Sequence, residues 1–542
     1  MKRLVPVLAG TLAVSAATLI TGLTGVSVKA GAAPVAPTFA KDVAPIVYNK
    51  CTMCHRAGEV APMAFMTYED VRPWAKVIKT KVMAREMPPW GADPEHSLKF
   101  RNDRSLSRAE MDTIAAWVDG GAPRGNDADM PPAPKFAEGW TAGREPDAIL
   151  EMPVDFAIPA EGELGVQMFY SKVPWSEDKF AETLEIRPGN RSVVHHAGVF
   201  VVDIPEGAHI DEHGRLVNAE GKASNDRGQG LAGRADVTAL PGANKLLSWV
   251  PGRGVDQHRA DIGKRIPAGK YINWQMHYNP NGKPTSDRSR LGIWFNKQNV
   301  THELLIRQAG DPLATTKGGL SLYRAEGKEV EYTADEGSTR RRSKTPDIPP
   351  YAEDWSLTGI TPVTEDITLY AMSPHMHLRG KSLKWVIVYP DGREQTILDV
   401  PKFDFNWQIE YELETPLKIP AGSKILGIGK YDNSPKNKWN PAPNLPVYWS
   451  EQSWDEMYQP FTLYSVDSQV GLRSVAVARA STSSLGGVLV YADPTPVLIS
   501  AARIAQGRSR RGRLAPPDFR QRFSRRAQTA LTPGSAARPY PR

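Results

Sequence analysis

Short apolar runs, each closed by turn-forming residues, repeat along this chain from about residue 146 onward and limit its fold more than any other feature. Within a run, apolar and polar residues alternate with a period of two, as in a strand that buries one face. Pro-Gly, Asn-Pro and Asp-Gly pairs separate the runs. The clearest runs are 193–202, 271–278, 291–295, 367–372, 383–389 and 425–431. Such a series predicts antiparallel β-sandwich or jelly-roll domains.

A small all-α domain is predicted ahead of these runs, over residues 38–128. Ser107 is followed three residues later by Glu110, which is the spacing of a capping box at the start of a helix. Met111, Ile114 and Val118 then recur at helical spacing. The proline-rich stretch 129–145 reads as a linker to the β domains.

The β domains are predicted over 146–308 and 354–467, with the polar stretch 309–353 between them. The last segment, 468–542, differs in composition. From residue 471 onward there are thirteen Arg, no Lys and two acids, a balance of +11, so the preceding 470 residues carry 7 − 11 = −4. The arginine-rich tail is typical of a disordered segment and receives no function. Because the rest of the chain is mildly acidic, we expect no nucleic-acid partner.

The first 32 residues have the layout of a secretory signal peptide. Lys2 and Arg3 precede an apolar stretch over 4–28, and small residues at 30–33 suit cleavage. A retained membrane anchor is the alternative, because a stretch of this length just spans a bilayer. Interrupting Pro and Gly residues count against an anchor. We therefore expect a periplasmic or secreted bacterial protein with no stable membrane span after signal cleavage.

Both cysteines of the chain belong to one Cys-x-x-Cys-His motif, formed by Cys51, Cys54 and His55. Two thiols three residues apart match the two vinyl groups of a haem, and the adjacent imidazole is placed to bind the iron. Zinc or dithiol chemistry is the alternative. Zinc would need further ligands, and His96 is the only other candidate in this region. The motif predicts one covalently attached haem c and leaves no cysteine for a structural disulfide.

Four methionines downstream of the motif are candidates for the sixth haem ligand: Met63, Met66, Met83 and Met87. Met87 is favoured because the two prolines that follow it hold the backbone extended and rigid. Core packing is its alternative role. The region resembles a class I-like cytochrome c domain, in which a methionine in a proline-bearing loop is the usual distal ligand.

Histidines occur in or beside three of the predicted strands. His375 and His377 are two residues apart, so in a strand they share a face and can bind one metal. His195 and His196 are neighbours that would point to opposite faces, and joint binding requires a bend or a bulge. His277 lies at the end of its run, before a turn.

Met457 follows these histidines about eighty residues later and offers a thioether. Imidazoles with one thioether suit copper that cycles between Cu(I) and Cu(II), because soft sulfur favours Cu(I). A methionine taken alone more often packs in a core. The order of the motifs makes copper the better hypothesis.

The order His-His, Gln-x-His-Tyr, His-x-His and Asp-Glu-Met resembles the copper type II, ascorbate-dependent monooxygenases, which include peptidylglycine α-hydroxylating and dopamine β-monooxygenases. The resemblance covers roughly residues 146–467 and implies two successive antiparallel β-sandwich domains. It implies an electron-donating copper held by His195, His196 and His277. It also implies an oxygen-binding copper held by His375, His377 and Met457, which would be the catalytic centre.

The resemblance therefore implies a copper-dependent monooxygenase that hydroxylates an activated C–H bond of a small organic substrate with O₂. The fused haem domain would pass on electrons from an upstream redox protein or small reductant. Two departures make a glycine-extended peptide doubtful as substrate: Ser373 stands where the peptide-hydroxylating enzymes have an arginine, and Phe461 where they have a tyrosine. The alternative function is a non-catalytic periplasmic haem and copper protein for electron transfer or copper binding.

Overall fold

The structure of the protein is a computed structural model, which describes residues 36–136, 139–162, 164–219, 221, 223, 244–316, 321–330, 345–449 and 453–469. The predicted signal peptide and nearly all of the arginine-rich tail lie outside the described residues. Among the helices that are described, none has both the length and the apolar character needed to cross a bilayer.

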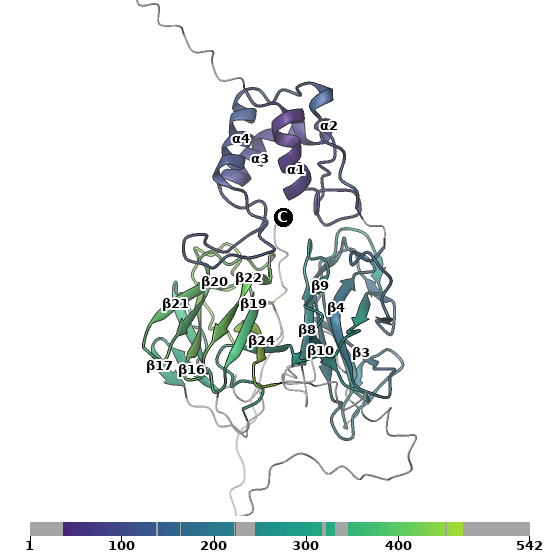
Figure 1. The fold of residues 1–542 in the computed structure, drawn as a ribbon, viewed down its shortest axis with the longest axis vertical. Coiled ribbons are helices and arrows are strands. Elements are labelled where there is room, and N and C mark those ends of the chain that lie inside the picture. Colours follow the sequence, from purple (N-terminus) through teal and green to yellow (C-terminus); the bar gives the residue numbers. More distant parts are fainter. Residues whose placement is uncertain are drawn as a thin grey trace, which may run out of the picture. The chain divides into compact units, whose positions relative to one another are not determined.

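Residues 39–129 form a helical segment. Its helices are η1 (Phe39–Val43), α1 (Ala44–Lys50), α2 (Tyr68–Val71), η2 (Arg72–Trp74), α3 (Ala75–Met83), α4 (Arg108–Asp119) and η3 (Asp127–Asp129) (Figure 1). They enclose a small apolar core that contains Phe39, Val47, Val71 and Trp117. The elements are short, so this core is modest in size, and the helical character predicted here is observed.

Helix α4 begins where the sequence predicts. The Ser107 hydroxyl accepts a hydrogen bond from the Glu110 amide, and the Glu110 carboxylate accepts one from the Ser107 amide. This reciprocal pair satisfies two amides that the first helical turn leaves without partners. Met111, Ile114 and Trp117 then form the buried face of the helix.

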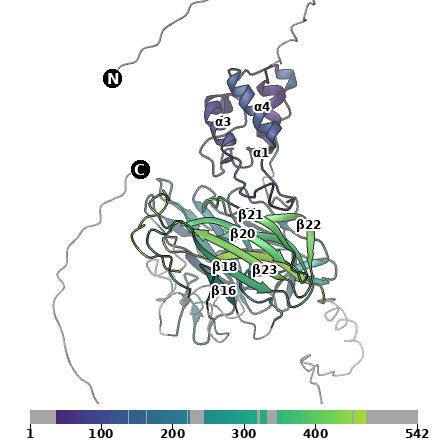
Figure 2. The ribbon, with the colours of Figure 1, turned by 90° about the vertical axis from the view of Figure 1, so that its left-hand side faces the viewer.

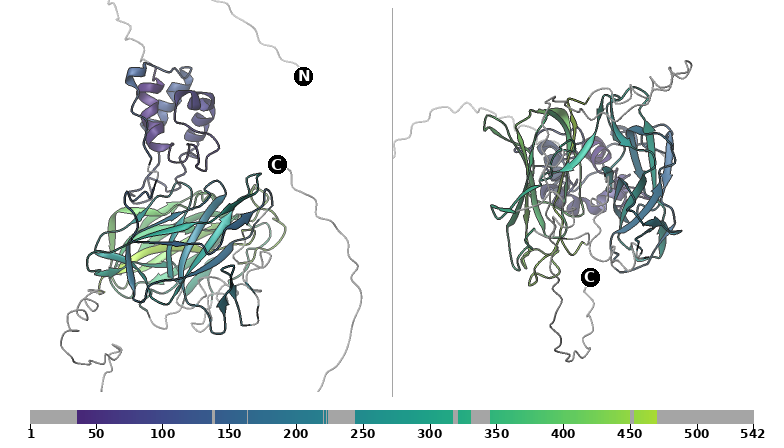
Figure 3. Two further views of the ribbon diagram at one scale, coloured as in Figure 1. Left: turned by 90° about the vertical axis from the view of Figure 1, so that its right-hand side faces the viewer. Right: turned by 90° about the horizontal axis from the view of Figure 1, so that it is seen from below.

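The helices and strands described after residue 130 are all strands, and they are divided between two bodies. The first β body, residues 148–303, contains two larger sheets (Figure 3). One sheet has the order β1 (Ala148–Glu151), β13 (Arg290–Phe295), β4 (Lys179–Arg187), β10 (Ile262–Ile266) and β14 (His302–Glu303), with β9 (Asp256–Gln257) paired to β4. The other has the order β3 (Gln167–Lys172), β11 (Tyr271–Tyr278), β5 (Val194–Val202) and β8 (Asn244–Trp249). Two small ribbons complete the body: β2 (Phe156–Ile158) with β12 (Thr285–Asp287), and β6 (His209–Ile210) with β7 (Leu216–Val217).

The two larger sheets of the first β body share one apolar core. Leu184 and Ile293 from one sheet belong to the same buried cluster as Val199 and Trp274 from the other. Alternate residues of each strand face this core, since neighbouring residues of a strand point to opposite faces. Sheet therefore packs on sheet, as expected for a sandwich.

The second β body, residues 305–466, repeats this plan with its own sheets and core. Its four-stranded sheet has the order β15 (Leu305–Gln308), β24 (Gln459–Val466), β19 (Ile367–His375) and β22 (Tyr411–Ile419). Its six-stranded sheet has the order β17 (Lys328–Val330), β16 (Leu322–Ala325), β18 (Trp355–Pro362), β23 (Lys424–Tyr431), β20 (Gly380–Val388) and β21 (Glu394–Val400) (Figure 2). Leu369 and Tyr464 from the first sheet share a core with Leu383 and Trp385 from the second.

The change from one body to the other corrects one predicted boundary. Residues up to 308 were expected in the first domain, but β15 pairs with β24 of the second body, while β14 pairs with β10 of the first. The change of sheet therefore falls at Leu304. The stretch 309–353, predicted as a separator, supplies β16 and β17 to the second body. Composition does not indicate the change of sheet, because the apolar pattern continues unbroken through residues 304–306.

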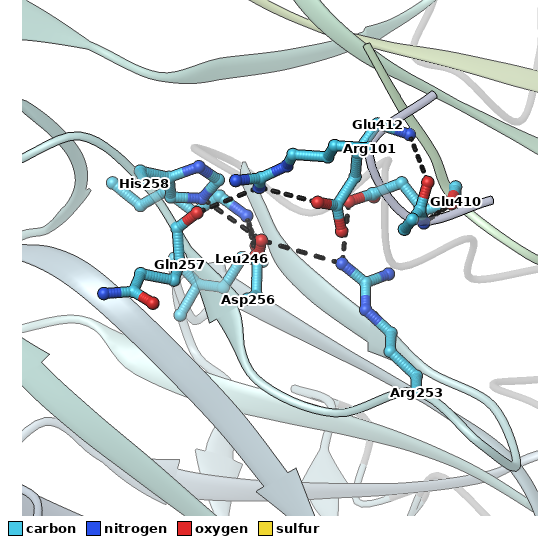
Figure 4. A network of polar contacts seen from close by, with 10 residues as sticks. Arg101, Leu246, Arg253, Asp256, Gln257, His258, Glu410 and Glu412 are labelled. Atoms are coloured by element: carbon cyan, nitrogen blue, oxygen red, sulfur yellow. Dashed lines mark hydrogen bonds and ion pairs between the residues drawn. The ribbon is translucent and has the colours of Figure 1, made fainter. Parts of the chain in front are cut away.

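A buried ionic network joins the two β bodies. Arg253, in the loop after β8, lies 2.7 Å from a Glu410 oxygen of the second body and 3.7 Å from an Asp256 oxygen of the first (Figure 4). Asp256 also binds Lys264 at 2.6 Å, and Arg101 of the helical segment binds Glu412 at 2.6 Å. Burial opposes the charge of Arg253, but the two carboxylates beside it raise its pKa above the ordinary value.

Candidate metal centres

A β-bulge turns two neighbouring histidines toward the same place. Strand β11 pairs with β5 in regular register as far as His277 opposite His196, and then Tyr278 lies opposite Val194. His195 is therefore the extra residue of a bulge, which lets its side chain join that of His196. The bend that joint binding requires is present.

His195, His196 and His277 form a compact cluster. One nitrogen of each imidazole lies within 4.8 Å of the others, a separation that suits three ligands of one metal ion. The Nδ1 of His277 is buried and has no hydrogen-bond partner, and leaving such an atom unpaired is costly unless something binds it. These imidazoles therefore fit a metal ion.

The histidines of this cluster are uncharged near neutral pH. Burial lowers the pKa of His277 to about 3, and the neighbouring His195 adds to the effect. Burial, followed by His277 and the other imidazoles, holds the pKa of His196 well below its usual range. Neutral imidazoles are the form that binds metal, so protons compete little with a metal here.

The second group of predicted ligands also comes together. His375 is the last residue of β19, and His377 follows it; both line the same pocket as Met457, which precedes β24. The Nε2 of His375 lies 3.3 Å from the Met457 sulfur. Met376, between the two histidines, is fully buried in the core, so the alternation predicted for this stretch is observed.

Two polar side chains hold these ligands in place. The Nδ1 of His375 contacts the amide oxygen of Gln408, which leaves Nε2 for a metal. The buried Glu456 carboxylate accepts hydrogen bonds from the backbone amides of His377 at 2.9 Å and Met457 at 3.2 Å. Burial raises the pKa of Glu456 to about 7. Glu456 thus holds the backbone at His377 and Met457.

Both ligand groups contribute to the lining of one pocket, which includes His196, His277, His375, His377 and Met457. The rings of His196 and His375 have centroids 6.1 Å apart. Phe405, in the loop between β21 and β22, contacts both groups: its ring centroid is 5.4 Å from that of His195 and 5.8 Å from that of His377. The space inside is about 50 Å³, which holds a few water molecules. A larger molecule needs the side chains that line the pocket to move.

The cysteine motif occupies the turn that follows α1. The amides of Cys54 and His55 both donate to the Cys51 carbonyl, at 3.1 and 3.0 Å, so one helical turn carries both thiols and the imidazole. The Nδ1 of His55 lies 3.2 Å from the Met63 carbonyl, which leaves Nε2 available to an iron. Phe65 stacks on the His55 ring at 4.2 Å. The positions of Cys51, Cys54 and His55 on one turn therefore fit a covalently attached haem.

The structure gives no contact between Met87 and this motif. The Met87 amide donates to the Lys81 carbonyl at 3.3 Å, a contact within the segment after α3. Met63 instead packs against the same apolar cluster as Cys51. Met87 as a haem ligand stays a prediction, and Met63 is a second candidate from the set of four.

The turn that bears the cysteines also contacts the first β body. Glu59 binds Arg191 at 2.5 Å. Gly252, in the loop after β8, approaches so closely that a Cβ built on it would lie 2.9 Å from the Cys54 sulfur. The same loop leads back along β8 to Ser248 and Trp249, which line the histidine pocket.

Three residues that line the pocket or contact the histidine groups carry no sequence signal that would have found them. Phe405 and Gln408 stand in the 401–410 loop, far in sequence from the ligands they contact. Lys245 of β8 lines the pocket and follows no motif. Only the folding of both β bodies brings these side chains together.

Comparisons with known proteins leave the family open. No protein-family model matches the chain, and no curated protein is similar to it. Among solved structures, an allantoicase is 8% identical over 51% of this chain and 81% of its own, with a TM-score of 0.13. A tandem CBM22 domain from Paenibacillus barcinonensis is 10% identical over 61% and 94%, with a TM-score of 0.11. Oxalate decarboxylase of Bacillus subtilis is 10% identical over 66% and 88%, with a TM-score of 0.09. Scores this low carry no argument about function.

Proposed function

We propose that the protein is an exported copper-dependent monooxygenase that hydroxylates an activated C–H bond of a small organic molecule with O₂. The observation that carries the proposal is the shared pocket. Two ligand groups of different composition, one of three imidazoles and one of two imidazoles and a thioether, face each other there. We propose that His195, His196 and His277 hold one copper, and that His375, His377 and Met457 hold the other.

The difference between the two ligand groups suits a division of labour. When bound, the coppers and a haem on Cys51, Cys54 and His55 would supply one-electron chemistry and the activation of oxygen. A thioether at one group favours Cu(I) there, while three neutral imidazoles suit either oxidation state. The chain's own part is to keep these ligands neutral, oriented and largely shielded from water.

Orientation of the ligands comes from polar partners outside the ligand groups. Gln408 fixes the ring of His375, and Glu456 fixes the backbone at His377 and Met457. Such partners set the tautomer and direction of metal-binding groups. Phe405 fills apolar space between the groups and limits the water that reaches them. A small substrate would displace this water and take its place beside His375 and Met457.

We propose that the haem accepts electrons from an upstream redox protein or small reductant. Contact of the Cys54 turn with Gly252 and Arg191 keeps the proposed haem region beside the first β body. Tethering of this kind raises the effective concentration of one partner at the other. It supports a role for His195, His196 and His277 as the group that takes electrons first.

The test is the copper-to-haem ratio of the full chain after export, from elemental analysis and haem absorbance. We expect two coppers per haem, and one copper per haem in the His375→Ala/Met457→Ala variant. His213→Ala, which removes an exposed histidine, is the matched control and should keep both coppers. Haem without stoichiometric copper contradicts the proposal. Two coppers with no oxygen consumption, under reducing conditions with any candidate substrate, favours a non-catalytic electron-transfer protein.

A further inference from the structure

A lysine lines the pocket between the two histidine groups. Lys245 lies on β8 of the first body, and its ammonium is 3.8 Å from the centre of the Phe461 ring, which belongs to β24 of the second body. The pocket that Lys245 lines also contains His196, His277 and His375. A positive charge is therefore placed within the space where a substrate would bind.

Among the residues that the structure describes, no carboxylate forms an ion pair with this ammonium. Within the described part of the chain, Lys245 makes no ion pair and no hydrogen bond, and its one polar contact is with the face of Phe461. Glu410 is the acid that acts on it electrostatically, but Glu410 is already bound to Arg253 at 2.7 Å. Removing a charge from water without a partner is unfavourable.

A neighbouring lysine shows what a purely structural role looks like in this fold. Lys264, which is 1% exposed, binds Asp256 at 2.6 Å and also contacts the Leu246 carbonyl. Lys245 lacks such partners and keeps part of its surface open to the pocket. Burial lowers the pKa of Lys245 to about 7, against the opposing influence of Glu410. The Phe461 ring and Glu410 offset part of the cost of holding a cation here, and a bound anion would offset more of it.

Apolar side chains take part in the rest of the lining, beside polar ones such as Ser373 and Gln459. Val166, Phe200, Trp249 and Phe461 contribute to it. Such a surface favours an apolar molecule, and a few polar groups then set its orientation. One cation among apolar walls selects a molecule that has an apolar body and an acidic end.

We propose that Lys245 is the anion-binding residue of this pocket, so that the molecule bound between the histidine groups is a small carboxylic acid or similar anion with an apolar body. As a statement about a substrate, this inference rests on the proposed function; as a statement about binding, it concerns the pocket alone. The carboxylate would accept hydrogen bonds from the ammonium, and the apolar body would lie toward Phe461 and the histidines.

The test compares pairs of ligands that have the same shape and differ in charge: propionate with propionamide, and benzoate with benzamide. Binding is measured by isothermal titration to the full chain, loaded with copper and kept reduced and anaerobic, because Cu(I) has little affinity for carboxylate oxygen. We expect the acid of each pair to bind at least about tenfold more tightly than its amide, the size of one charge-assisted hydrogen bond.

Three variants make the result specific. Lys245→Met keeps the apolar stem and should abolish the preference for the acid while leaving amide binding unchanged, which also shows that the pocket is folded. Lys245→Arg keeps the charge and should retain the preference. Lys172→Met, which removes an exposed lysine at the end of β3, is the matched control and should behave as the unaltered chain.

Two outcomes overturn the inference. One is equal or no binding of acid and amide by the unaltered chain. The other is a preference for the acid that persists in Lys245→Met, which would assign the anion to copper or to another cation. Copper content, measured on the same samples, separates this inference from the proposed function. A chain without two coppers that still shows a Lys245-dependent preference contradicts the monooxygenase and leaves the anion site intact.

Discussion

At the scale of single residues, the histidine groups show how burial prepares a side chain for metal binding. An exposed imidazole is partly protonated near neutral pH and must lose a proton before it binds a metal. His277 and His196 have given up that proton already, because their surroundings exclude water and place other imidazoles beside them. The fold therefore contributes to affinity before any metal arrives.

This preparation has a measurable cost in the metal-free chain. Unfolded histidine titrates near 6.5, whereas folded His277 titrates at about 3. Between these values the unfolded state binds more protons, so the free energy of unfolding falls as pH falls through this range. We expect urea midpoints of the chelator-treated chain to decrease from pH 7 to pH 5. A His196→Gln/His277→Gln variant should show a weaker decrease, and an equal decrease in both would contradict this account.

Residues with a motif around them were predictable from sequence, and residues without one were not. His195, His196 and His277 meet as the order of motifs indicated, and so do His375 and Met457. Lys245 and Phe405 were missed. Their contacts with the histidine groups and the pocket depend on contact between the two β bodies, and local sequence does not encode such contact.

At the scale of elements, periodicity and turn chemistry predicted six strands and the main helix, and most of the shorter strands were not predicted. The run 271–278 coincides with β11, and the run 425–431 nearly coincides with β23. The exchange of sheets at Leu304 was missed, because a strand's pattern tells which face is buried and not which neighbour it pairs with. The sequence predicted a bend or bulge at His195 and His196 only if both histidines bind the same metal, and the structure has a bulge there.

The cap of α4 offers a test at this scale. Ser107→Ala removes the hydroxyl that accepts from Glu110, and such a loss costs about 0.5–2 kcal/mol of stability. We expect a lower midpoint for the unfolding transition of the helical segment, followed by circular dichroism at 222 nm. Ser107→Asp retains an acceptor and should restore most of the loss. If both variants behave alike, the cap contributes nothing to this helix.

At the scale of the whole described molecule, charge as well as apolar contact joins the two β bodies. Arg253 binds Glu410 across the junction and lies beside Asp256. A buried ion pair adds little compared with an apolar contact, but removing one partner leaves the other charged and unpaired. The relative position of the two β bodies therefore depends on a small number of charged side chains.

Arg253→Met is expected to be strongly destabilising for this reason, by about 3–5 kcal/mol. Thermal unfolding and limited proteolysis between the β bodies are the measurements. The double variant Arg253→Met/Glu410→Met removes both buried charges and should recover part of the stability. An additive loss in the double variant would show that the two side chains are not coupled.

The close approach of Gly252 to Cys54 bears on the order in which the protein matures. Burial raises the pKa of the Cys51 thiol to about 12 and also raises that of Cys54, and a protonated thiol is a poor nucleophile. With the 252 loop against the motif, Gly252 closely approaches the Cys54 sulfur. Attachment of the proposed haem would then come before the helical segment settles on the β structure. Assembly of this chain would be a sequence of steps, with cofactor ligation first and docking second.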